Sequence, residues 1–416
     1  MSESLKFIHA SDFHLDRPIC GLPEIPKHLL ETLASAPYES AQRVFDFAMT
    51  ERVDFVLLSG DLFDHDSGSA RAPAFLLNNF QRLAENGTHI YWCAGETDHP
   101  DRWPSSIQLP DNVVTFSTGI VEEAEHLRNG IPIATIMGAG FDPKRRNGDH
   151  FAAGHRQNTV NIALTYGEME SANLVADGIH YWAMGGKHKP TRLDRAGSHI
   201  SWPGTTQGRT PKESGPHGFN YVRVDSNGKF KIQAVQSDRV RWLPQKIAIA
   251  ENVNKKELKE ALTDRALKVI ADTTDQIILS RWFLATDGEF NPRIRKEGWA
   301  DEILEWLRDE FGRGDKGLWS TSVNIETPKS LPIEWYEEDT ILGEFLRVVG
   351  RYQSDESLKI NLHDYMPHSV KGDVMASAAH ISRDRREAIL RKSAMIGVNY
   401  LAAHKDIKEV NADTTL

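Results

Sequence analysis

The chain has 416 residues, which is enough for two or three domains of ordinary size. Its 40% hydrophobic and 26% charged residues are typical of a soluble protein, and no apolar run reaches the roughly 18 residues that cross a membrane. The formal net charge of −10 argues against a generally basic nucleic-acid-binding protein but allows a local basic groove. With only two cysteines and a polar N-terminus without a signal peptide, we expect a cytoplasmic protein.

Residues 5 to about 240 alternate short apolar runs with amphipathic stretches, which predicts an α/β sandwich. The first strand is expected at 7–10 and the second at 53–58. A helix is expected from Ser40 to Thr50, with Ser40 as its N-cap, and another from 73 to 86. The remaining strands of this part are expected at 89–93, 113–116, 133–137, 161–165, 181–184, 199–202, 218–224 and 229–236.

Beyond residue 240 the pattern changes to a small α/β module and then to helices. The elements expected there are helices at 254–269 and 300–311, strands at 276–284 and 318–326, and two further helices at 340–353 and 373–401. We therefore predict three domains, covering residues 1–240, 241–335 and 336–416.

Acidic and imidazole side chains follow three of the predicted strands. Asp12 and His14 come after the first strand, Asp61 after the second, and His188 after the strand at 181–184. Strands that end in such residues can bring them together at one edge of a sheet, where α/β folds place their sites. Two carboxylates and two imidazoles suit Mn²⁺, Fe²⁺ or Zn²⁺ better than Ca²⁺ or Mg²⁺. Taken alone, each aspartate could instead cap a helix.

The order of these motifs resembles that of the calcineurin-like metallophosphoesterases. Within that family the chain is most similar to the SbcD-type nuclease subunits of bacterial DNA double-strand-break repair, including the YhaO-like group. The resemblance covers residues 5 to about 240 and implies a four-layer β-sandwich flanked by helices, then a small α/β capping domain and C-terminal helices. The motifs that carry it are D-x-H at 12–14, G-D-L-F-D at 60–64 and G-x-x-H at 185–188, with supporting runs at 202–206 and 213–219.

The first metal of the resembling family is held by residues that are all present in this chain. They correspond to Asp12, His14, Asp61 and His188. We therefore expect one divalent transition metal, with Mn²⁺ as the first choice and Fe²⁺ or Zn²⁺ as alternatives. Asp64 corresponds to a residue that supports the loop and does not bind metal.

The second metal position of that family is largely lost. Besides Asp61 it requires an Asn and two His, and this chain has Glu96, Tyr166 and Gly186 in their places. Glu96 is the one remnant that could still bind a second ion. The family's catalytic His, which protonates the leaving group, corresponds to Thr97. Because a two-metal site clamps the phosphate between its ions, we expect weak or lost activity.

Three further features have two interpretations each. His99 could replace the missing catalytic His, but it lies two positions late and could be a surface histidine. Lys187 could put a fixed positive charge where the second metal would sit, or be an exposed loop lysine. The basic runs at 144–146 and 187–195 could form a DNA groove or be solvated loops.

Two classes of function follow from the resemblance. The chain is either a metal-dependent exonuclease or phosphodiesterase acting on DNA ends, or an inactive adaptor that binds DNA or a partner ATPase. The capping domain would contact DNA, and the C-terminal helices would dock on an SbcC-type, SMC-like ATPase or pack back on the capping domain. A homodimer is compatible with both classes, and no membrane partner is expected. The capping domain and C-terminal helices count against a third class, a small-molecule phosphoesterase.

Overall fold

A computed structural model describes residues 5–67, 69–99, 102–104, 106–142, 151, 159–167, 178–195, 197–249, 253–273, 275–286, 299–313, 317–325, 331, 333–358, 360 and 383–401. It confirms the predicted mixed α/β class. Contacts within the chain define two compact units: one combines residues 1–244, 268–280 and 310–321, and the other combines 245–267, 281–309 and 322–416. The division into three domains stays a prediction. None of the described helices is both long and apolar enough to cross a bilayer.

The first sheet has six strands, and the parallel pairing of four of them places their C-terminal ends at one edge. They are β1 (Leu5–Ala10), β2 (Phe55–Ser59), β3 (His89–Cys93), β4 (Val113–Phe116), β11 (Gly218–Val224) and β12 (Phe230–Gln236). Their order is β12-β11-β1-β2-β3-β4, in which β1 to β4 are parallel and β11 is antiparallel to both its neighbours. Helix α1 (Leu30–Glu51) connects β1 to β2, and α2 (Arg71–Glu85) connects β2 to β3.

The second sheet also has six strands, in the order β5-β6-β7-β8-β10-β9. They are β5 (Glu122–Arg128), β6 (Ile131–Ala139), β7 (Val160–Tyr166), β8 (Tyr181–Gly185), β9 (Thr191–Arg195) and β10 (Ser198–Trp202). The two edge strands, β5 and β9, were not predicted. Their sequences are mostly charged, as is usual for an exposed edge, and therefore lack an apolar run.

The two sheets pack face to face. Phe7 and Phe55 of the first sheet stack with ring centroids 5.1 Å apart, and the ring of Tyr181 from the second sheet lies 5.3 Å from Phe7. Because successive side chains of a strand alternate between faces, Ile8 and Val56 point the other way and join the core beneath α1 and α2. The apolar cluster that includes Trp182, on the opposite face of the second sheet, contains no residue of a described helix, so the fourth layer stays a prediction.

Helix α1 begins at Leu30, well before the predicted start at Ser40. The N-cap assignment was therefore wrong: Ser40 is buried within the helix, and its Oγ lies 2.9 Å from the Pro37 carbonyl oxygen. A proline disfavours a helix interior, so the sequence pattern favoured a start after Pro37. The earlier turns are stabilised instead by packing, because Leu33 belongs to a buried apolar cluster with Trp242.

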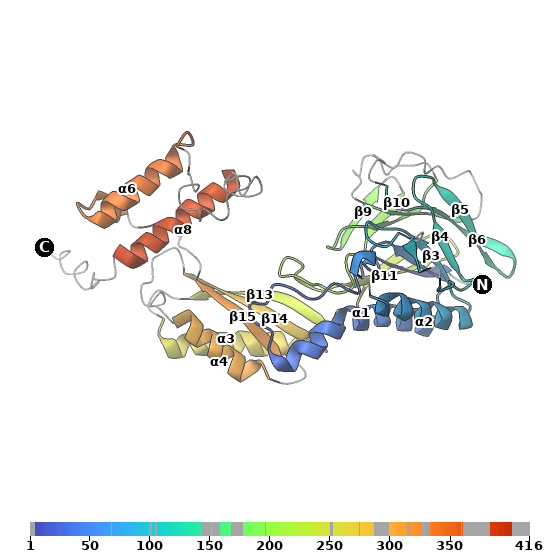
Figure 1. The fold of residues 1–416 in the computed structure, drawn as a ribbon, viewed down its shortest axis with the longest axis horizontal. Coiled ribbons are helices and arrows are strands. Elements are labelled where there is room, and N and C mark those ends of the chain that lie inside the picture. The colour runs from blue at the N-terminus through green and yellow to red at the C-terminus, as the bar shows by residue number, and fades with distance from the viewer. Residues whose placement is uncertain are drawn as a thin grey trace. The chain divides into compact units, whose positions relative to one another are not determined.

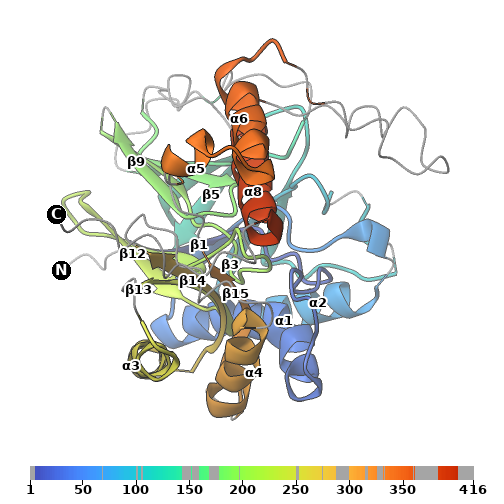
Figure 2. The same ribbon diagram turned by 90° about the vertical axis from the view of Figure 1, so that its left-hand side faces the viewer.

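A third sheet follows in the order β13-β14-β15. Its strands are β13 (Val240–Ile249), β14 (Ile277–Thr286) and β15 (Leu318–Ile325), and helices α3 (Lys255–Ala271) and α4 (Trp299–Phe311) lie on one face of it (Figures 1 and 2). The two helices and the last two strands match the predicted elements within a few residues. The strand β13 was not predicted, because Pro244 in its interior argues against a strand.

The described C-terminal part is helical, as predicted. It contains α5 (Ile333–Glu337), α6 (Ile341–Ser354) and α8 (Arg383–Leu401). Thr340 caps α6 by accepting a 3.2 Å hydrogen bond from the Gly343 amide. Leu346 of α6 and Val398 of α8 are fully buried in one apolar cluster. The first part of the predicted last helix, 373–382, lies outside the described residues.

Candidate metal centre

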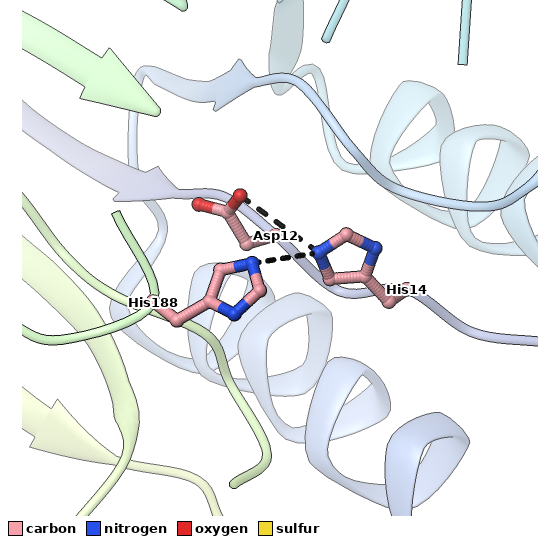
Figure 3. Close-up of side chains that lie close together, drawn as sticks. All are labelled: Asp12, His14 and His188. Atoms are coloured by element: carbon pink, nitrogen blue, oxygen red, sulfur yellow. Dashed lines mark hydrogen bonds and ion pairs between the residues drawn. The ribbon is translucent and has the colours of Figure 1, made fainter. Parts of the chain in front are cut away.

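The carboxylate of Asp12 and the imidazoles of His14 and His188 converge beyond the ends of β1 and β8 (Figure 3). One donor atom of each residue lies within 4.8 Å of the other two, and the described ranges contain no second cluster of this kind. The Nε2 atoms of His14 and His188 are 3.2 Å apart, and His14 Nε2 is 3.9 Å from Asp12 Oδ1. Asp12 and His14 are buried, whereas the His188 side chain is 37% exposed, so the cluster is accessible from the His188 side.

Three predicted ligands have backbone conformations that residues other than glycine rarely adopt. The φ angles of Asp12, His14 and Asp61 are 54°, 44° and 55°. The Asp12 amide donates to Gly60 O at 2.9 Å, and the His14 amide donates to Asp61 O at 3.0 Å. Such conformations cost on the order of 1–3 kcal/mol each and concentrate at functional sites. The sequence shows which residues follow the strands, but it does not show this turn geometry.

The donor atoms of the cluster fit a bound cation. Asp12 Oδ1 is buried and has no hydrogen-bond partner among the described residues, although buried polar atoms normally have one. His188 Nδ1 lies 2.7 Å from Glu213 Oε1, and because a carboxylate only accepts, this nitrogen carries the proton; the Nε2 lone pair therefore faces the cluster, where His14 Nε2 is its neighbour at 3.2 Å. A carboxylate behind an imidazole commonly orients metal-binding histidines. Mn²⁺, Fe²⁺ and Zn²⁺ all suit this set of one carboxylate and two imidazoles.

Burial favours the neutral forms of two of the three side chains. It raises the pKa of Asp12 to about 6. It lowers the pKa of His14 well below the ordinary value, and the positive charge of Arg209 adds to that effect. Burial also opposes the ionisation of Glu213, but the hydrogen bond from His188 and the charge of Arg209 outweigh it and hold the pKa of Glu213 at about 2. The cluster therefore offers a neutral imidazole, while a cation would offset the cost of ionising Asp12.

Asp61, the fourth predicted ligand, lies beside this cluster. Its Oδ2 atom is 3.8 Å from His14 Nε2, but the residue is outside the closest group of three. Tyr166 Oη donates a 2.6 Å hydrogen bond to Oδ2. The Thr97 amide donates to Oδ1 at 2.9 Å, and Thr97 Oγ1 lies 3.0 Å from the same atom. Both carboxylate oxygens thus already accept hydrogen bonds from the protein, and the role of Asp61 as a metal ligand stays a prediction.

The residues at the second-metal positions do not form a ligand set in the described structure. Glu96 is exposed and lies outside the cluster. Gly186 has a φ of 89°, and its amide donates a 3.1 Å hydrogen bond to Asp12 Oδ2. A Cβ atom at Gly186 would lie 3.2 Å from Tyr166 Cζ. Hydrogen bonds within the chain therefore engage the oxygens that a second ion would use, which supports the prediction of a single metal.

The two other candidates are engaged elsewhere. His99 Nε2 lies 3.3 Å from Thr118 Oγ1. The ammonium of Lys187 lies 4.0 Å from the centre of the Trp202 ring, which is a cation–π contact. Neither residue belongs to the cluster of potential metal ligands. The ammonium of Lys187 therefore contacts the Trp202 ring and does not supply its positive charge at the second-metal position.

Asp64 has the supporting position that the resemblance implies. Its Oδ2 atom accepts from Arg17 at 3.2 Å, and its Oδ1 atom accepts from the Asp66 amide at 3.0 Å. Of the two basic runs, 144–146 lies outside the described residues. In the other run, Arg192 forms a 3.0 Å ion pair with Asp194.

Asp98 organises the site, although no pattern in the sequence assigned it a role. Its Oδ1 atom accepts hydrogen bonds from the amides of Gly95 and Asp61, at 2.7 and 2.9 Å. Its Oδ2 atom accepts from the Leu62 amide at 2.9 Å and from Trp92 Nε1 at 3.1 Å. Burial raises the pKa of Asp98 to about 7, while the backbone donors act in the opposite direction. Asp98 joins the turn after β3 to the turn after β2 and so positions Asp61.

Glu213 is the second organising carboxylate that sequence reasoning missed. It lies in the loop before β11, within the run at 213–219 that supported the resemblance without a stated role. Besides accepting from His188, it accepts hydrogen bonds at Oε2 from the amides of Arg209 and Thr210, at 2.6 and 3.1 Å. These contacts depend on how the loop folds, and no residue spacing indicates them.

Known proteins resemble this chain over most of its length. The chain matches the calcineurin-like phosphoesterase family over residues 5–190. It is 30% identical over 342 residues to a protein described as an uncharacterized metallophosphoesterase, YhaO, from Bacillus subtilis, which covers 79% of this chain and 83% of the relative. It is 22% identical over 349 residues to the DNA double-strand break repair protein Mre11 of Methanopyrus kandleri, covering 75% and 72% of the two chains. A shorter similarity, 28% over 98 residues and 24% of each chain, relates it to the protein of the same name from Sulfolobus acidocaldarius.

Proposed function

Because this chain belongs to the calcineurin-like phosphoesterase family, whose members use divalent metals, we propose that it is a single-metal phosphodiesterase that acts slowly on DNA ends. The metal ion is held by Asp12, His14 and His188, with Asp61 beside them. Mn²⁺ is the first candidate. The chain works as the nuclease-type subunit of a repair complex of the SbcC and SbcD kind.

One observation carries the single-metal part of the proposal. Asp61 is the only residue of the family's second ligand set that this chain keeps, and both its oxygens accept hydrogen bonds from Tyr166 and Thr97. A second ion would have to displace these donors. It would also lack the two imidazoles that the family supplies, because Tyr166 and Gly186 stand in their places.

The chain's own residues define what the site can do. An ion bound at the cluster would supply Lewis acidity to a phosphate group and lower the pKa of a bound water. Glu213 orients the His188 imidazole, and the Gly186 amide holds Asp12 by its other oxygen. Thr97 Oγ1 lies 2.9 Å from Phe63 O and 3.0 Å from Asp61 Oδ1, so its proton is already used. It is therefore not available to the leaving group.

Without an acid for the leaving group, hydrolysis is slow. General acid–base catalysis typically contributes roughly 10²–10⁴-fold to a rate. A substrate with a good leaving group loses least from its absence. The proposed activity is thus weaker on DNA than on an activated ester such as bis-p-nitrophenyl phosphate.

Two observations support DNA and an ATPase as partners. Curated relatives that match this chain are named as DNA double-strand break repair proteins. The helices α6 and α8 expose large apolar side chains that a partner could cover: Ile341 is 75% exposed and Tyr400 is 82% exposed. We assign these helices to docking on the helical part of an SbcC-type ATPase.

The proposal is tested by measuring metal content and hydrolysis on the same preparation. We expect one Mn²⁺ per chain, weak hydrolysis of bis-p-nitrophenyl phosphate, slower cleavage of a blunt DNA duplex, and loss of both activities in Asp12→Ala. Turnover of the duplex end on the order of 1 s⁻¹ or more, a rate ordinary for an enzyme, would refute the slow single-metal assignment if Asp61→Asn abolished it.

The alternative is an adaptor without catalysis, and the occupied hydroxyl of Thr97 favours it. If the protein is an adaptor, the wild type and Asp12→Ala should bind the DNA duplex with equal affinity, and neither should hydrolyse the duplex or bis-p-nitrophenyl phosphate. A slow enzyme would show hydrolysis that rises with added Mn²⁺ and disappears in the variant.

A further inference from the structure

A buried arginine beside the metal centre has unused hydrogen-bonding capacity. The Arg209 side chain is 8% exposed, and its Nε atom is enclosed without an acceptor among the described residues. Among the residues that the structure describes, the one ion pair of Arg209 is with Glu213. The Oε1 atom of Glu213 lies 3.8 Å from Arg209 Nη2, which is too far for a hydrogen bond. A guanidinium has five donors, and a buried charge is normally paired and hydrogen-bonded. Arg209 can therefore accommodate an anion.

The loop fixes Arg209 next to the proposed ligands. Glu213 Oε1 lies 2.7 Å from His188 Nδ1 as well as 3.8 Å from Arg209 Nη2, so one oxygen atom stands between the guanidinium and an imidazole of the cluster. The Arg209 amide donates to Glu213 Oε2 at 2.6 Å, and its carbonyl oxygen accepts from the Cys20 amide at 2.8 Å. Because both backbone groups are held, the direction of the side chain is constrained.

The charge of Arg209 also acts on the metal centre. Its guanidinium is separated from the His188 imidazole only by Glu213 Oε1, which lies 3.8 Å from Arg209 Nη2 and 2.7 Å from His188 Nδ1. Burial lowers the pKa of Arg209 itself, while the carboxylate of Glu213 and, to a smaller extent, those of Asp12 and Asp61 act against that shift. The arginine thus contributes positive potential to the cluster, where a phosphate group would carry negative charge.

We propose that Arg209 binds the phosphate group of a phosphate ester at the metal centre. Its guanidinium can donate two parallel hydrogen bonds to phosphate oxygens, a geometry that an ammonium does not offer. Lys187, the cation that the sequence singled out, is held over Trp202 instead. The inference rests on the proposed single-metal function, and it names a residue that supplies the positive charge a second ion would bring to the substrate.

Calorimetric titration of the full-length, Mn²⁺-loaded protein with inorganic phosphate tests this role. We expect Arg209→Gln to weaken phosphate binding by roughly tenfold or more, because charge-assisted hydrogen bonds are lost. Arg209→Lys should weaken it less, since the charge remains. The matched control is Arg223→Gln. Arg223 lies opposite Lys6 in the β1–β11 register, at the end of β1 away from Asp12, so this variant should bind phosphate as the wild type does. Equal phosphate affinity of Arg209→Gln and wild type would overturn the inference.

Metal content and melting temperature separate this inference from the proposed function. If the wild type takes up no Mn²⁺, the proposed function fails. Phosphate titration of the metal-free proteins then tests whether Arg209 binds phosphate. Weaker phosphate binding by Arg209→Gln than by the wild type supports that role, and equal binding, or no binding by either protein, overturns it. If Arg209→Gln is unstable or loses its metal, the comparison moves to Arg209→Lys. An Arg209→Lys protein that keeps the metal and binds phosphate like the wild type would also overturn the inference.

Discussion

The phenol of Tyr166 donates a 2.6 Å hydrogen bond to Oδ2 of Asp61. Burial raises the pKa of Tyr166, so the phenol stays protonated and acts as the donor. The opposite oxygen of Asp61 accepts from the amide of Thr97. A carboxylate that bridges two cations would need these lone pairs for metal. Tyr166 and a second ion would therefore compete for one oxygen atom.

Tyr166→Phe removes this donor and retains most of the ring packing. We expect the free energy of unfolding, measured by urea denaturation, to fall by about 1.5–3 kcal/mol, the range for a hydrogen bond to a charged group. Tyr91→Phe is the control, because Tyr91 Oη lies 3.1 Å from a neutral partner, His126 Nδ1, and its loss should cost about 1 kcal/mol. The metal content of Tyr166→Phe should not rise, since phenylalanine provides no ligand. A variant as stable as the wild type would mean that the bond contributes nothing to folding.

The metal content itself is the second prediction. We expect at most one tightly bound divalent transition metal per chain, because three donor residues converge and the second set is engaged by hydrogen bonds. Asp12→Ala and His188→Ala should each lose it, as counted by elemental analysis after dialysis. Two fully occupied ions per wild-type chain would contradict this, and would require Glu96 and a further ligand to complete the second position.

Glu213→Gln tests the orientation of His188. An amide has an NH₂ group in place of one oxygen, so it cannot accept from both His188 and the amides of the loop. We expect the dissociation constant for Mn²⁺ to rise by about 10–100-fold, the usual effect of losing a group that orients a metal ligand. Glu85→Gln, at the exposed end of α2, is the matched control. Unchanged affinity in Glu213→Gln would show that His188 needs no carboxylate behind it.

The sequence predicted those parts of the site that follow directly from strand ends. Asp12 and His14 follow β1 of the first sheet and His188 follows β8 of the second sheet, so the face-to-face packing of two sheets, and not one sheet edge as predicted, brings them together. Asp98 and Glu213 could not be found in this way, because each acts through hydrogen bonds to a folded loop. The same holds for the fold: apolar strands were predicted closely, whereas the charged edge strands β5 and β9 depend on neighbours that no local pattern reveals.

Acid stability should depend on His9. The residue is fully buried, with Nδ1 2.9 Å from Tyr181 Oη and Nε2 2.9 Å from Ser59 Oγ. Burial lowers its pKa from 6.5 to about 3, so below pH 6.5 the unfolded chain binds a proton that the folded chain does not. The stability contributed by neutral His9 is therefore complete above pH 6.5 and is lost as the pH falls toward 3.

Urea denaturation at pH 7.5 and pH 5.0 measures this effect. The titration of His9 should lower the free energy of unfolding of the wild type by about 1.36 kcal/mol per pH unit, which is about 2 kcal/mol between pH 6.5 and pH 5.0. His9→Gln is less stable at pH 7.5 but lacks this titration, so it should lose about 2 kcal/mol less than the wild type over the same interval. Equal losses in both proteins would mean that another group causes the acid sensitivity.

The last prediction concerns Gly186, which has a φ of 89° and lies against the ring of Tyr166. Gly87 is the matched control: its φ is 73°, and a Cβ atom there would meet nothing within 4 Å. Gly87→Ala should cost about 1–2 kcal/mol for the left-handed conformation alone. Gly186→Ala should cost more, because its Cβ atom would also lie 3.2 Å from Tyr166 Cζ, and Gly186→His should be less stable still without gaining a metal.

Restoring all four positions should reverse this result. The changes Glu96→Asn, Thr97→His, Tyr166→His and Gly186→His together supply the missing ligands and the acid, and they remove the ring that Gly186→His meets alone. We expect the combined variant to bind two metals and to hydrolyse bis-p-nitrophenyl phosphate faster than the wild type, with an effect that is not the sum of the single changes. If Gly186→His is as stable as Gly87→His, or the combined variant still binds one metal, then Tyr166 and Gly186 do not occupy the places of the family's two histidines.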